Sequence, residues 1–298
     1  MRHTAPDTDA LYRFLFEGSE VRGEIVHLDA SWRAVLSRHP YPERVRNQLG
    51  EALAAAVLLT ATLKLEGALI LQVQGTGPLR TLVAQATHRR TLRGLARWDG
   101  EVPDGPLDAV FGSGQVVLTL EPEGGERYQG IVPLSGANLA EALEAYFRTS
   151  EQLGTRLRLA ADGERAAGLL LQRLPGPSAP GGEGDDLDWT RLVTLANTVR
   201  AQELIKLPTK TLLHRLFHEE DLRLFEPEPV AFRCTCSRQR VEDTLRAMGQ
   251  AEVESLLEEQ GQIEVGCEFC NRTYRWDLVD ARQLFAAATH HQMPAGRH

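Results

Sequence analysis

Four cysteines, the only ones in this chain of 298 residues, lie in one short stretch near its C-terminus. They form a Cys-x-Cys pair, Cys234 and Cys236, and a Cys-x-x-Cys pair, Cys267 and Cys270, with thirty residues between the pairs. Two close pairs joined by a connector of this length can bring four thiolates onto one tetrahedral ion. We therefore predict that these four cysteines bind one zinc ion per chain.

A disulfide framework is the alternative for the same cysteines, and it belongs to oxidising compartments. The first thirty residues contain no apolar secretory core, because carboxylates are scattered through them. These carboxylates include Asp7, Asp9, Glu17, Glu20 and Glu24. We therefore expect a reducing, cytoplasmic environment and a metal rather than structural disulfides.

What the zinc does is a separate question. Many sites of this type only hold together a small module that lacks a core of its own. However, Cys234 and Cys236 can close onto each other only as a short, strained disulfide ring, which suits a reversible redox element better than a structural bond. Both a structural role and a redox role remain open from the spacing alone.

Composition and charge exclude several classes of protein. Apolar residues make up 42% of the chain and charged residues 25%, as in ordinary globular proteins. The net charge of −8 argues against a broad nucleic-acid surface, which needs a basic excess. The longest uncharged apolar run, Ala52 to Leu63, is shorter than the ~20 residues that span a bilayer. We expect neither nucleic acid nor membrane as a partner.

Residues 1–174 show the patterns of an α+β domain in which layered sheet surrounds a buried helix. Residues 45–65 carry apolar side chains on every side from Leu49 to Leu63, which predicts a helix buried all round. Two shorter helices are expected after the N-caps Asp29 and Asn138. Runs typical of strands, the last of them buried on both faces, occupy residues 11–27, 67–73, 79–84, 92–97, 116–120, 130–133, 156–160 and 167–174.

Residues 175–230 form the second predicted region, a flexible connector followed by a helical linker. Pro, Gly and Asp dominate residues 175–186, which favours an unstructured connector. Amphipathic helices are predicted after Asp188 and Thr209, each taken as an N-cap. Both helices are short and of modest propensity, so their order must come from docking an apolar face onto a neighbour. We expect them to unfold if that neighbour is lost.

Residues 231–298 form the third predicted region, a zinc-binding module. Two helical stripes end at Gly249 and Gly261, and two short strands are expected at residues 262–265 and 274–276. Few apolar residues are available for a core. We therefore expect the fold to depend on metal binding, which supplies about 10–16 kcal/mol in small zinc domains.

The cysteines and their surroundings together resemble the 33 kDa chaperonin family, which are redox-regulated heat-shock holdases. The resemblance is carried by FRCTCSRQRVEDTLRAMG, IEVGCEFCNRTY and LLHRLFHEEDLRLFEPEPV. It continues through RGEIVHLDASWRAVLSRHPYP, ALILQVQGTGPLR, GERYQGIVPLSG and AAGLLLQRLP, and so covers nearly the whole chain.

The resemblance implies a stress-response chaperone of the cytoplasm that binds unfolding proteins without ATP and is not an enzyme. It further implies that Cys234, Cys236, Cys267 and Cys270 hold one zinc ion when reduced. On oxidation, Cys234–Cys236 and Cys267–Cys270 would form disulfides, zinc would leave, the linker would unfold, and a homodimer would form.

Two other classes use the same cysteines. A zinc-ribbon nucleic-acid-binding protein is the main alternative, since arginines lie near the cysteine pairs. These are Arg233, Arg238, Arg240, Arg272 and Arg275. A zinc hydrolase would need an open coordination position, whereas four thiolates close the shell.

Overall fold

The computed structural model describes residues 8–64, 66–174 and 183–289. Contacts divide the chain into two compact units, residues 1–233 and 234–298. The predicted α+β fold, with layered sheet around a buried helix, a helical linker and a four-cysteine module, is confirmed. The boundaries predicted at residues 174 and 230 stay predictions, because contacts alone do not show which parts unfold independently. Within the described ranges, no helix has the length and apolar character that crossing a bilayer requires.

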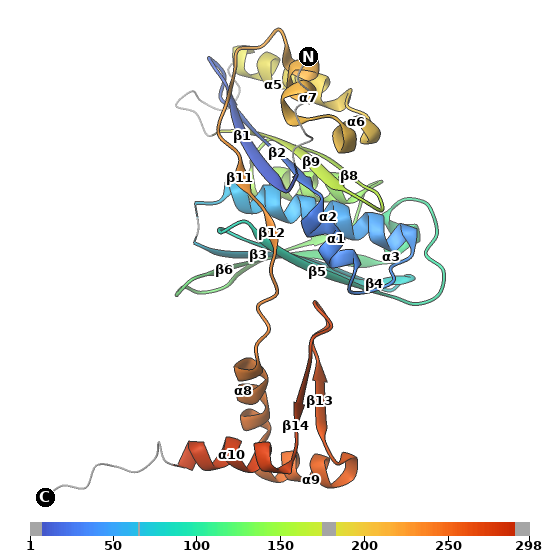
Figure 1. Cartoon of the computed structure of the whole chain (residues 1–298). Coiled ribbons are helices and arrows are strands. Elements are labelled where there is room, and N and C mark those ends of the chain that lie inside the picture. The colour runs from blue at the N-terminus through green and yellow to red at the C-terminus, as the bar shows by residue number, and fades with distance from the viewer. Residues whose placement is uncertain (1–7, 65, 175–182, 290–298) are drawn as a thin grey trace, which may run out of the picture. The chain divides into compact units, whose positions relative to one another are not determined.

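The first unit contains two six-stranded sheets, here called sheet A and sheet B (Figure 1). Sheet A has the order β10-β1-β2-β9-β8, with β11 also paired to β1, and sheet B has the order β12-β5-β4-β3-β6-β7. All pairs are antiparallel except β12 with β5. The strands of sheet A are β1 (Ala10–Phe16), β2 (Val21–Leu28), β8 (Thr155–Ala161), β9 (Ala166–Arg173), β10 (Leu222–Leu224) and β11 (Glu228–Pro229). Those of sheet B are β3 (Gly67–Gly75), β4 (Leu79–Thr87), β5 (Thr91–Trp98), β6 (Gly114–Pro122), β7 (Tyr128–Pro133) and β12 (Ala231–Phe232).

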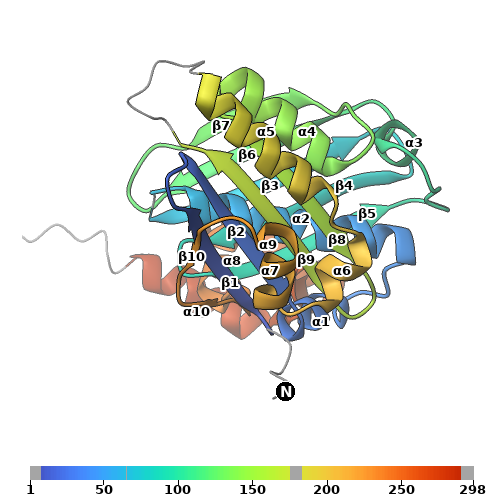
Figure 2. The same cartoon turned by 90° about the horizontal axis from the view of Figure 1, so that it is seen from above.

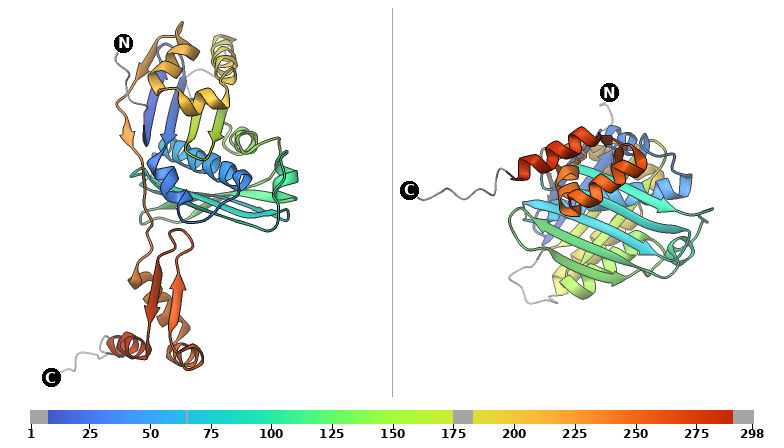
Figure 3. Two further views of the ribbon diagram at one scale, coloured as in Figure 1. Left: turned by 45° about the vertical axis from the view of Figure 1, so that its right-hand side comes forward. Right: turned by 90° about the horizontal axis from the view of Figure 1, so that it is seen from below.

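Helix α2 (Glu43–Thr62) lies between the two sheets, as the left view of Figure 3 shows. It contacts β3, β4 and β5 of sheet B and β2, β8 and β9 of sheet A. Its residues from Ala52 to Ala61 are all buried. The predicted all-round burial is therefore confirmed, and its cause is that sheet covers the helix on two sides.

The other helices of the first unit are mostly short. They are α1 (Ala30–Leu36), α3 (Leu107–Phe111), α4 (Leu139–Tyr146), α5 (Glu183–Asn197), α6 (Ala201–Lys206) and α7 (Thr209–Phe217). A π-helix, η1 (Phe147–Glu151), continues α4. The predicted cap of α4 is confirmed, since the Asn138 side chain accepts a hydrogen bond from the N–H of Glu141 at 3.0 Å.

The cap of α1 differs from the prediction. Asp29 occupies the N-cap position, but its side chain makes no capping bond. The carboxylate of Asp9 accepts instead from the N–H groups of Asp29 (3.0 Å), Ala30 (2.8 Å) and Ser31 (3.0 Å). Asp29 is left to pair with Arg165 at 3.2 Å. A residue twenty positions upstream thus supplies the cap, which no local pattern reveals.

Helices α5, α6 and α7 lie across the face of sheet A that is turned away from α2 (Figure 2). The Phe217 ring meets the Phe16 ring edge to face, with centroids 5.0 Å apart. The apolar side chains buried together there include Phe14, Phe16, Val21, Ile25, Leu169, Leu171, Leu192, Ala196, Val199, Leu204, Ile205, Leu212, Leu213, Leu216 and Phe217. The neighbour on which the linker helices dock is therefore sheet A.

The linker differs from the prediction in its boundaries. Helix α5 begins at Glu183, inside the predicted connector, so Asp188 lies within the helix and is not its N-cap. Pro208 holds the N-cap position of α7, and the hydroxyl of Thr209 lies 3.3 Å from His27 Nδ1. The chain also breaks between α5 and α6, where one helix was expected. The rest of the predicted connector, residues 175–182, lies outside the described residues.

Strand β9 is buried on both faces, as predicted. Alternate side chains of a strand point to opposite faces. Leu170 accordingly belongs to the core around α2, while Leu169 and Leu171 meet the linker helices. The continuous apolar run of this strand thus reflects two separate cores.

The segment after α7 returns to the sheets in three short strands that the sequence did not predict. β10 and β11 pair with β1 of sheet A, and β12 pairs with β5 of sheet B. The carboxylate of Glu228 pairs with Arg90 at 2.7 Å and with Arg13 at 3.1 Å. This return segment therefore joins both sheets just before the first cysteine.

One buried carboxyl group gives the first unit a testable pH dependence. Glu24 of β2 is only 2% exposed, and burial raises its pKa from 4.5 to about 7, although Arg22, Arg13 and Arg90 act in the opposite direction. Between these two pH values the unfolded chain releases the proton more readily than the folded one. The folded state therefore loses stability as the pH rises from about 4.5 to about 7.

We expect Glu24→Gln to remove this dependence. The free energy of unfolding of the variant minus that of wild type should increase with pH. From below pH 4.5 to above pH 7, this difference should grow by about 3 kcal/mol. Urea unfolding of both proteins at a series of pH values measures it, and taking the difference cancels the titration of the cysteines. A difference that stays constant from pH 5 to pH 8 would contradict the shift.

Candidate metal centre

Up to residue 289, the second unit contains three helices and one hairpin. These are α8 (Arg238–Met248), α9 (Gln250–Gln260), β13 (Ile263–Gly266), β14 (Thr273–Trp276) and α10 (Leu278–Thr289). α8 and α9 end at the predicted glycines, Gly249 with φ 95° and Gly261 with φ 76°, conformations that disfavour other residues. The predicted strands are confirmed.

Helix α10 was not predicted, although the sequence contains a signal for it. The N–H of Asp280 donates to the Asp277 carboxylate at 2.8 Å, and the N–H of Asp277 donates to the Asp280 carboxylate at 3.3 Å. This reciprocal pair is a capping-box arrangement with Asp in both positions. Spacing of this kind before an apolar run would have identified the helix.

Cys267 and Cys270 lie in the tight turn that joins β13 to β14. The carbonyl of Cys267 accepts from the N–H groups of Cys270 (3.3 Å) and Asn271 (2.7 Å). Asn271 has a φ of 56°, the left-handed conformation that Asn tolerates better than most residues. With this backbone arrangement, the sulfur atoms of Cys267 and Cys270 lie within 4.8 Å of each other.

Cys234 and Cys236 lie immediately before α8. Ser237 is the N-cap of that helix, and its hydroxyl accepts from the N–H of Arg240 at 3.2 Å. The first pair of cysteines is therefore positioned by a helix start and the second by a hairpin turn. Partial positive charge at a helix N-terminus also favours the thiolate form of nearby cysteines.

The four sulfur atoms converge. Cys234 Sγ lies 3.6 Å from Cys267 Sγ, and Cys236 Sγ lies 3.4 Å from Cys270 Sγ. All four lie within 4.8 Å of one another, and all four cysteines are free thiols. Tetrahedral zinc with bonds of about 2.3 Å places its sulfur ligands about 3.8 Å apart. The four residues predicted as ligands thus fit a single tetrahedral metal ion.

The pKa shifts of Cys234, Cys267 and Cys270 also fit a metal site. Burial raises the pKa of Cys270 to about 12, helped by its contacts with the other three sulfurs, and also raises the pKa of Cys267. Burial acts to raise the pKa of Cys234 as well, but hydrogen bonds with Cys236, Cys267 and Cys270 outweigh it and lower that pKa to about 7. The cluster therefore loses one proton easily and the last with difficulty, because negative sulfurs at these separations repel one another. A divalent cation would remove that repulsion.

Tyr274 is a site residue that the sequence did not reveal. Its hydroxyl donates to Cys236 Sγ at 3.2 Å. Hydrogen bonds from the surroundings orient metal ligands and stabilise their charge. Tyr274 stands on β14, four residues after Cys270, and nothing in its spacing marks it as different from a packing residue.

The core of the second unit is as thin as predicted. Arg238 adds to it by stacking over the Trp276 ring, 4.7 Å from its centroid, and by donating to the carbonyl of Arg275 at 3.0 Å. The buried apolar residues are Leu245, Val253, Leu257, Ile263, Trp276, Ala281 and Leu284. So few side chains give little hydrophobic stabilisation, so cross-linking by a metal is expected to contribute a large share of the stability.

Two of the five arginines near the cysteines pair with acidic neighbours. Arg238 pairs with Glu242 at 3.1 Å and with Asp280 at 3.3 Å, and Arg275 pairs with Glu264 at 2.7 Å. Charge that is balanced in this way attracts phosphates less than an open basic patch does. Arg238 and Arg275 therefore contribute little to an open basic patch of the kind that the nucleic-acid alternative needs.

Comparison with known proteins yields matches along almost the full length. A family model described as Hsp33 protein matches residues 9–277. A 33 kDa chaperonin of Nitrosococcus oceani is 59% identical over 290 residues, which cover 97% of this chain and 99% of that protein. A 33 kDa chaperonin of Pseudomonas aeruginosa is 49% identical over 284 residues, covering 94% of this chain and 96% of that one.

One solved structure has the same fold. The crystal structure of the 33 kDa chaperonin from Thermotoga maritima aligns with a TM-score of 0.80 at 22% identity, covering 95% of this chain and 99% of that one. An experimental structure thus shares the fold of this chain over most of its length.

Replacing Tyr274 tests whether its hydroxyl supports the metal site. Tyr274→Phe keeps the ring but removes the donor to Cys236, so we expect metal affinity to fall roughly tenfold. Thr273→Val, an exposed position on the same strand, is the matched control and should leave affinity unchanged. Competition with a chromogenic chelator measures both. Equal affinities for Tyr274→Phe and wild type would show that the bond does not act on the bound metal.

Proposed function

The chain belongs to the Hsp33 family of 33 kDa chaperonins, and we propose that it is a redox-regulated, ATP-independent holdase that binds unfolding proteins under oxidative stress. It works in the cytoplasm, is not an enzyme, and forms a homodimer when oxidised. The reduced form holds one zinc ion and is inactive.

The sensor in this proposal is the four-cysteine centre. Zn²⁺ on Cys234, Cys236, Cys267 and Cys270 neutralises the thiolates and cross-links a unit with a thin core. An oxidant of the peroxide class takes two electrons from each pair of thiolates, and one sulfur–sulfur bond forms per pair. A disulfide sulfur is no longer a thiolate ligand, so the metal leaves and the unit loses that source of stability.

The observation that carries the proposal is the apolar interface between the linker helices and sheet A. Helices α6 and α7 have six and nine residues, too short to be stable alone in water. They persist because their apolar side chains are buried against Phe14, Phe16 and Ile25. Release of these helices would expose apolar surface on the sheet and on the linker at once, which is what a holdase needs.

The return segment Leu222–Phe232 connects the sensor to this interface along the chain. It follows α7, runs along β1 and β5, and leads directly into Cys234. We propose that unfolding of the cysteine unit destabilises this segment and, through it, the docked state of α5, α6 and α7. The linker is then the bistable element of the switch.

The chemistry of the sensor is tested by oxidising the zinc-loaded protein. We expect one zinc ion per chain before oxidation, its release on oxidation, and disulfides Cys234–Cys236 and Cys267–Cys270, with holdase activity appearing only afterwards and without nucleotide. The across-pair distances of 3.6 and 3.4 Å make Cys234–Cys267 and Cys236–Cys270 the competing pairing. Mass mapping of peptides decides between them, and aggregation suppression measures activity. Zinc retained after full oxidation, or equal activity in the reduced form, would overturn the scheme.

The role of the linker is tested by a charge placed in its interface. Leu213 is 3% exposed, so Leu213→Asp should weaken docking by at least about 3 kcal/mol and give partial holdase activity in the reduced, zinc-bound protein. Leu187→Asp is the matched control, because Leu187 lies on α5 and is 69% exposed. It should remain inactive when reduced.

Amide exchange supplies the second readout for the linker. On oxidation, exchange between Trp189 and Phe225 should accelerate while Leu49 to Leu63 stay protected, because α2 keeps its cover on both sides. If wild-type activity appears while amide exchange in the linker is unchanged, then the linker is only a passive tether.

A further inference from the structure

Strand β7 (Tyr128–Pro133) ends sheet B and leaves one edge open (Figure 2). The N–H of Leu134 donates to the carbonyl of Gly114, which fixes the register of the ladder between β6 and β7. Hydrogen-bonded residues alternate along an antiparallel pair. The N–H and C=O groups of Gln129 and Ile131 therefore point away from β6. In the part of the chain that the structure describes, no strand pairs with this edge.

The same strand exposes large apolar side chains. Tyr128 is 55% exposed and Ile131 is 59% exposed. In the described parts of the first unit, the other exposed large apolar residues are Leu187 and Phe225, on and after the linker helices. Apolar exposure on the sheets themselves is thus concentrated on β7, beside unpaired main-chain groups.

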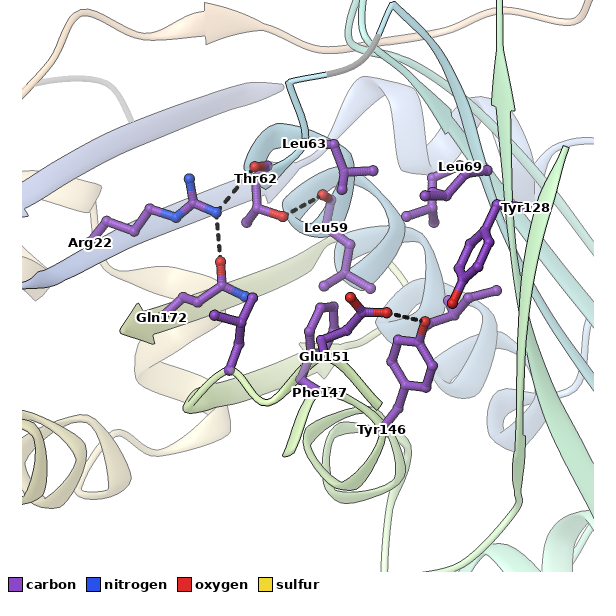
Figure 4. A pocket seen from close by; sticks show the side chains of 13 residues that line it. Arg22, Leu59, Thr62, Leu63, Leu69, Tyr128, Tyr146, Phe147, Glu151 and Gln172 are labelled. Carbon is purple, nitrogen blue, oxygen red and sulfur yellow. Dashed lines mark hydrogen bonds between the residues drawn. The ribbon is translucent and has the colours of Figure 1, made fainter. Parts of the chain in front are cut away.

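A cavity of about 160 Å³ adjoins β7, and Tyr128 forms part of its wall (Figure 4). It lies at the C-terminal end of α2 between the two sheets. Its apolar lining consists of Leu59, Leu63, Leu69, Leu118, Leu120, Phe147 and Leu153. A cavity of about 150 Å³ with such walls accepts a benzene molecule, so this one is large enough for a leucine or phenylalanine side chain.

Several polar groups around the cavity already have hydrogen-bond partners, although Arg22 Nε has none among the described residues. Tyr146 donates to the Glu151 carboxylate at 2.6 Å, and the Arg22 guanidinium donates to Gln172 at 2.5 Å and to the carbonyl of Thr62 at 3.1 Å (Figure 4). What the cavity offers to a ligand is therefore mainly apolar surface.

The π-helix η1 supplies two side chains of the cavity wall. Phe147 and Glu151, its first and last residues, both line the cavity. The turn that ends α4 therefore forms part of the cavity wall on this side.

We propose that an extended segment of an unfolding client adds to the open edge of β7 as a further strand and places one apolar side chain in the cavity beside Tyr128. The proposal rests on the proposed holdase function and names one of its client-binding surfaces. In strand addition, main-chain hydrogen bonds provide affinity that does not depend on sequence, and a side-chain pocket provides selectivity. That combination suits a protein whose partners share only an unfolded, apolar character.

The edge of β7 is open in the reduced form too, but it is too short to make that form active by itself. β7 has six residues, Pro133 has no N–H, and Gln129 and Ile131 each offer one donor, so the edge alone binds weakly. When the linker is released, the same client chain can hold two surfaces, and linked weak sites bind far more tightly than either alone. The open edge is thus an anchor present in both redox states.

Amide exchange at β7 tests the proposal directly. The probe is a peptide of about ten residues that alternates leucine and threonine, with lysine at each end. We expect it to slow exchange of the Gln129 and Ile131 amides at least about tenfold in both redox states, while the Gly130 and Val132 amides, already in the ladder, stay unchanged. The same peptide with alternate N-methylated residues on its pairing edge should have no effect.

Two other outcomes would overturn it. Gln129 and Ile131 amides that stay fast at millimolar peptide exclude strand addition. Protection that needs no peptide and grows with protein concentration assigns the edge to a second copy of the chain instead.

Variants connect the edge to holdase activity. Ile131→Lys adds a charge to the open edge, and Leu63→Trp fills the cavity, so each should weaken binding of an unfolded client to the oxidised protein at least about fivefold. Gln74→Lys, an exposed position on the central strand β3 of the same sheet, is the control and should bind normally.

The readouts separate this inference from the proposed function. Zinc content, disulfide formation and linker exchange should match wild type in all three variants. Normal client binding by Ile131→Lys and Leu63→Trp would overturn the inference and leave the redox switch intact, whereas an inactive oxidised wild type would overturn the proposed function itself.

Discussion

Sheet A carries apolar side chains on both of its faces, so it needs two covers. Helix α2 covers one face and is itself enclosed by sheet B, which makes that contact part of the permanent core. Helices α5, α6 and α7 cover the other face, and nothing in the described part of the first unit encloses them in turn. The two faces are buried to similar degrees but by covers of very different intrinsic stability. A switch can act on such a fold by removing the weaker cover while the rest stays folded.

The stability of the cysteine unit depends on its four sulfur atoms. The described part of the unit has a core of only seven buried apolar residues, and its four sulfurs lie too close together to be ionised at once without a cation. For both reasons, the stability of the unit depends on whether the four sulfur atoms bind a metal or are oxidised. A metal would supply cross-links and neutralise charge in one step, and oxidation would remove both contributions in one step. The unit is therefore suited to convert a change at sulfur into loss of structure.

Between these parts runs the return segment from Leu222 to Phe232. It is bound to both sheets by short strands and by Glu228, whose carboxylate meets Arg13 and Arg90. A connection of this kind ties the start of the cysteine unit to the end of α7 more closely than a free linker would. At the opposite edge of sheet B, the cavity beside β7 is formed by α2, α4, η1 and strands of both sheets, and its lining includes no residue of α5, α6 or α7. A client attached there, as we propose, would not need the linker as part of its binding site, so two surfaces could act on one chain.

The sequence by itself predicted the features that depend on a pattern within one element or motif. The spacing of Cys234, Cys236, Cys267 and Cys270 predicted one centre, and the structure brings all four together. Apolar residues on every side of α2 and along β9 predicted burial from two sides, and Asn138 with Glu141 predicted a cap. Each is a pattern within one element, where periodicity and side-chain chemistry suffice.

Tertiary structure decided what depends on residues far apart in the chain. Asp9 replaces Asp29 as the cap of α1, the strands β10, β11 and β12 are too short to show a period, and Tyr274 becomes a partner of Cys236 only through the turn between them. The apolar stripes of the linker required a partner, but only the fold identified sheet A as that partner. The apolar stripe of a helix indicates how much of its surface must be buried. Which surface covers it depends on the fold of the whole unit.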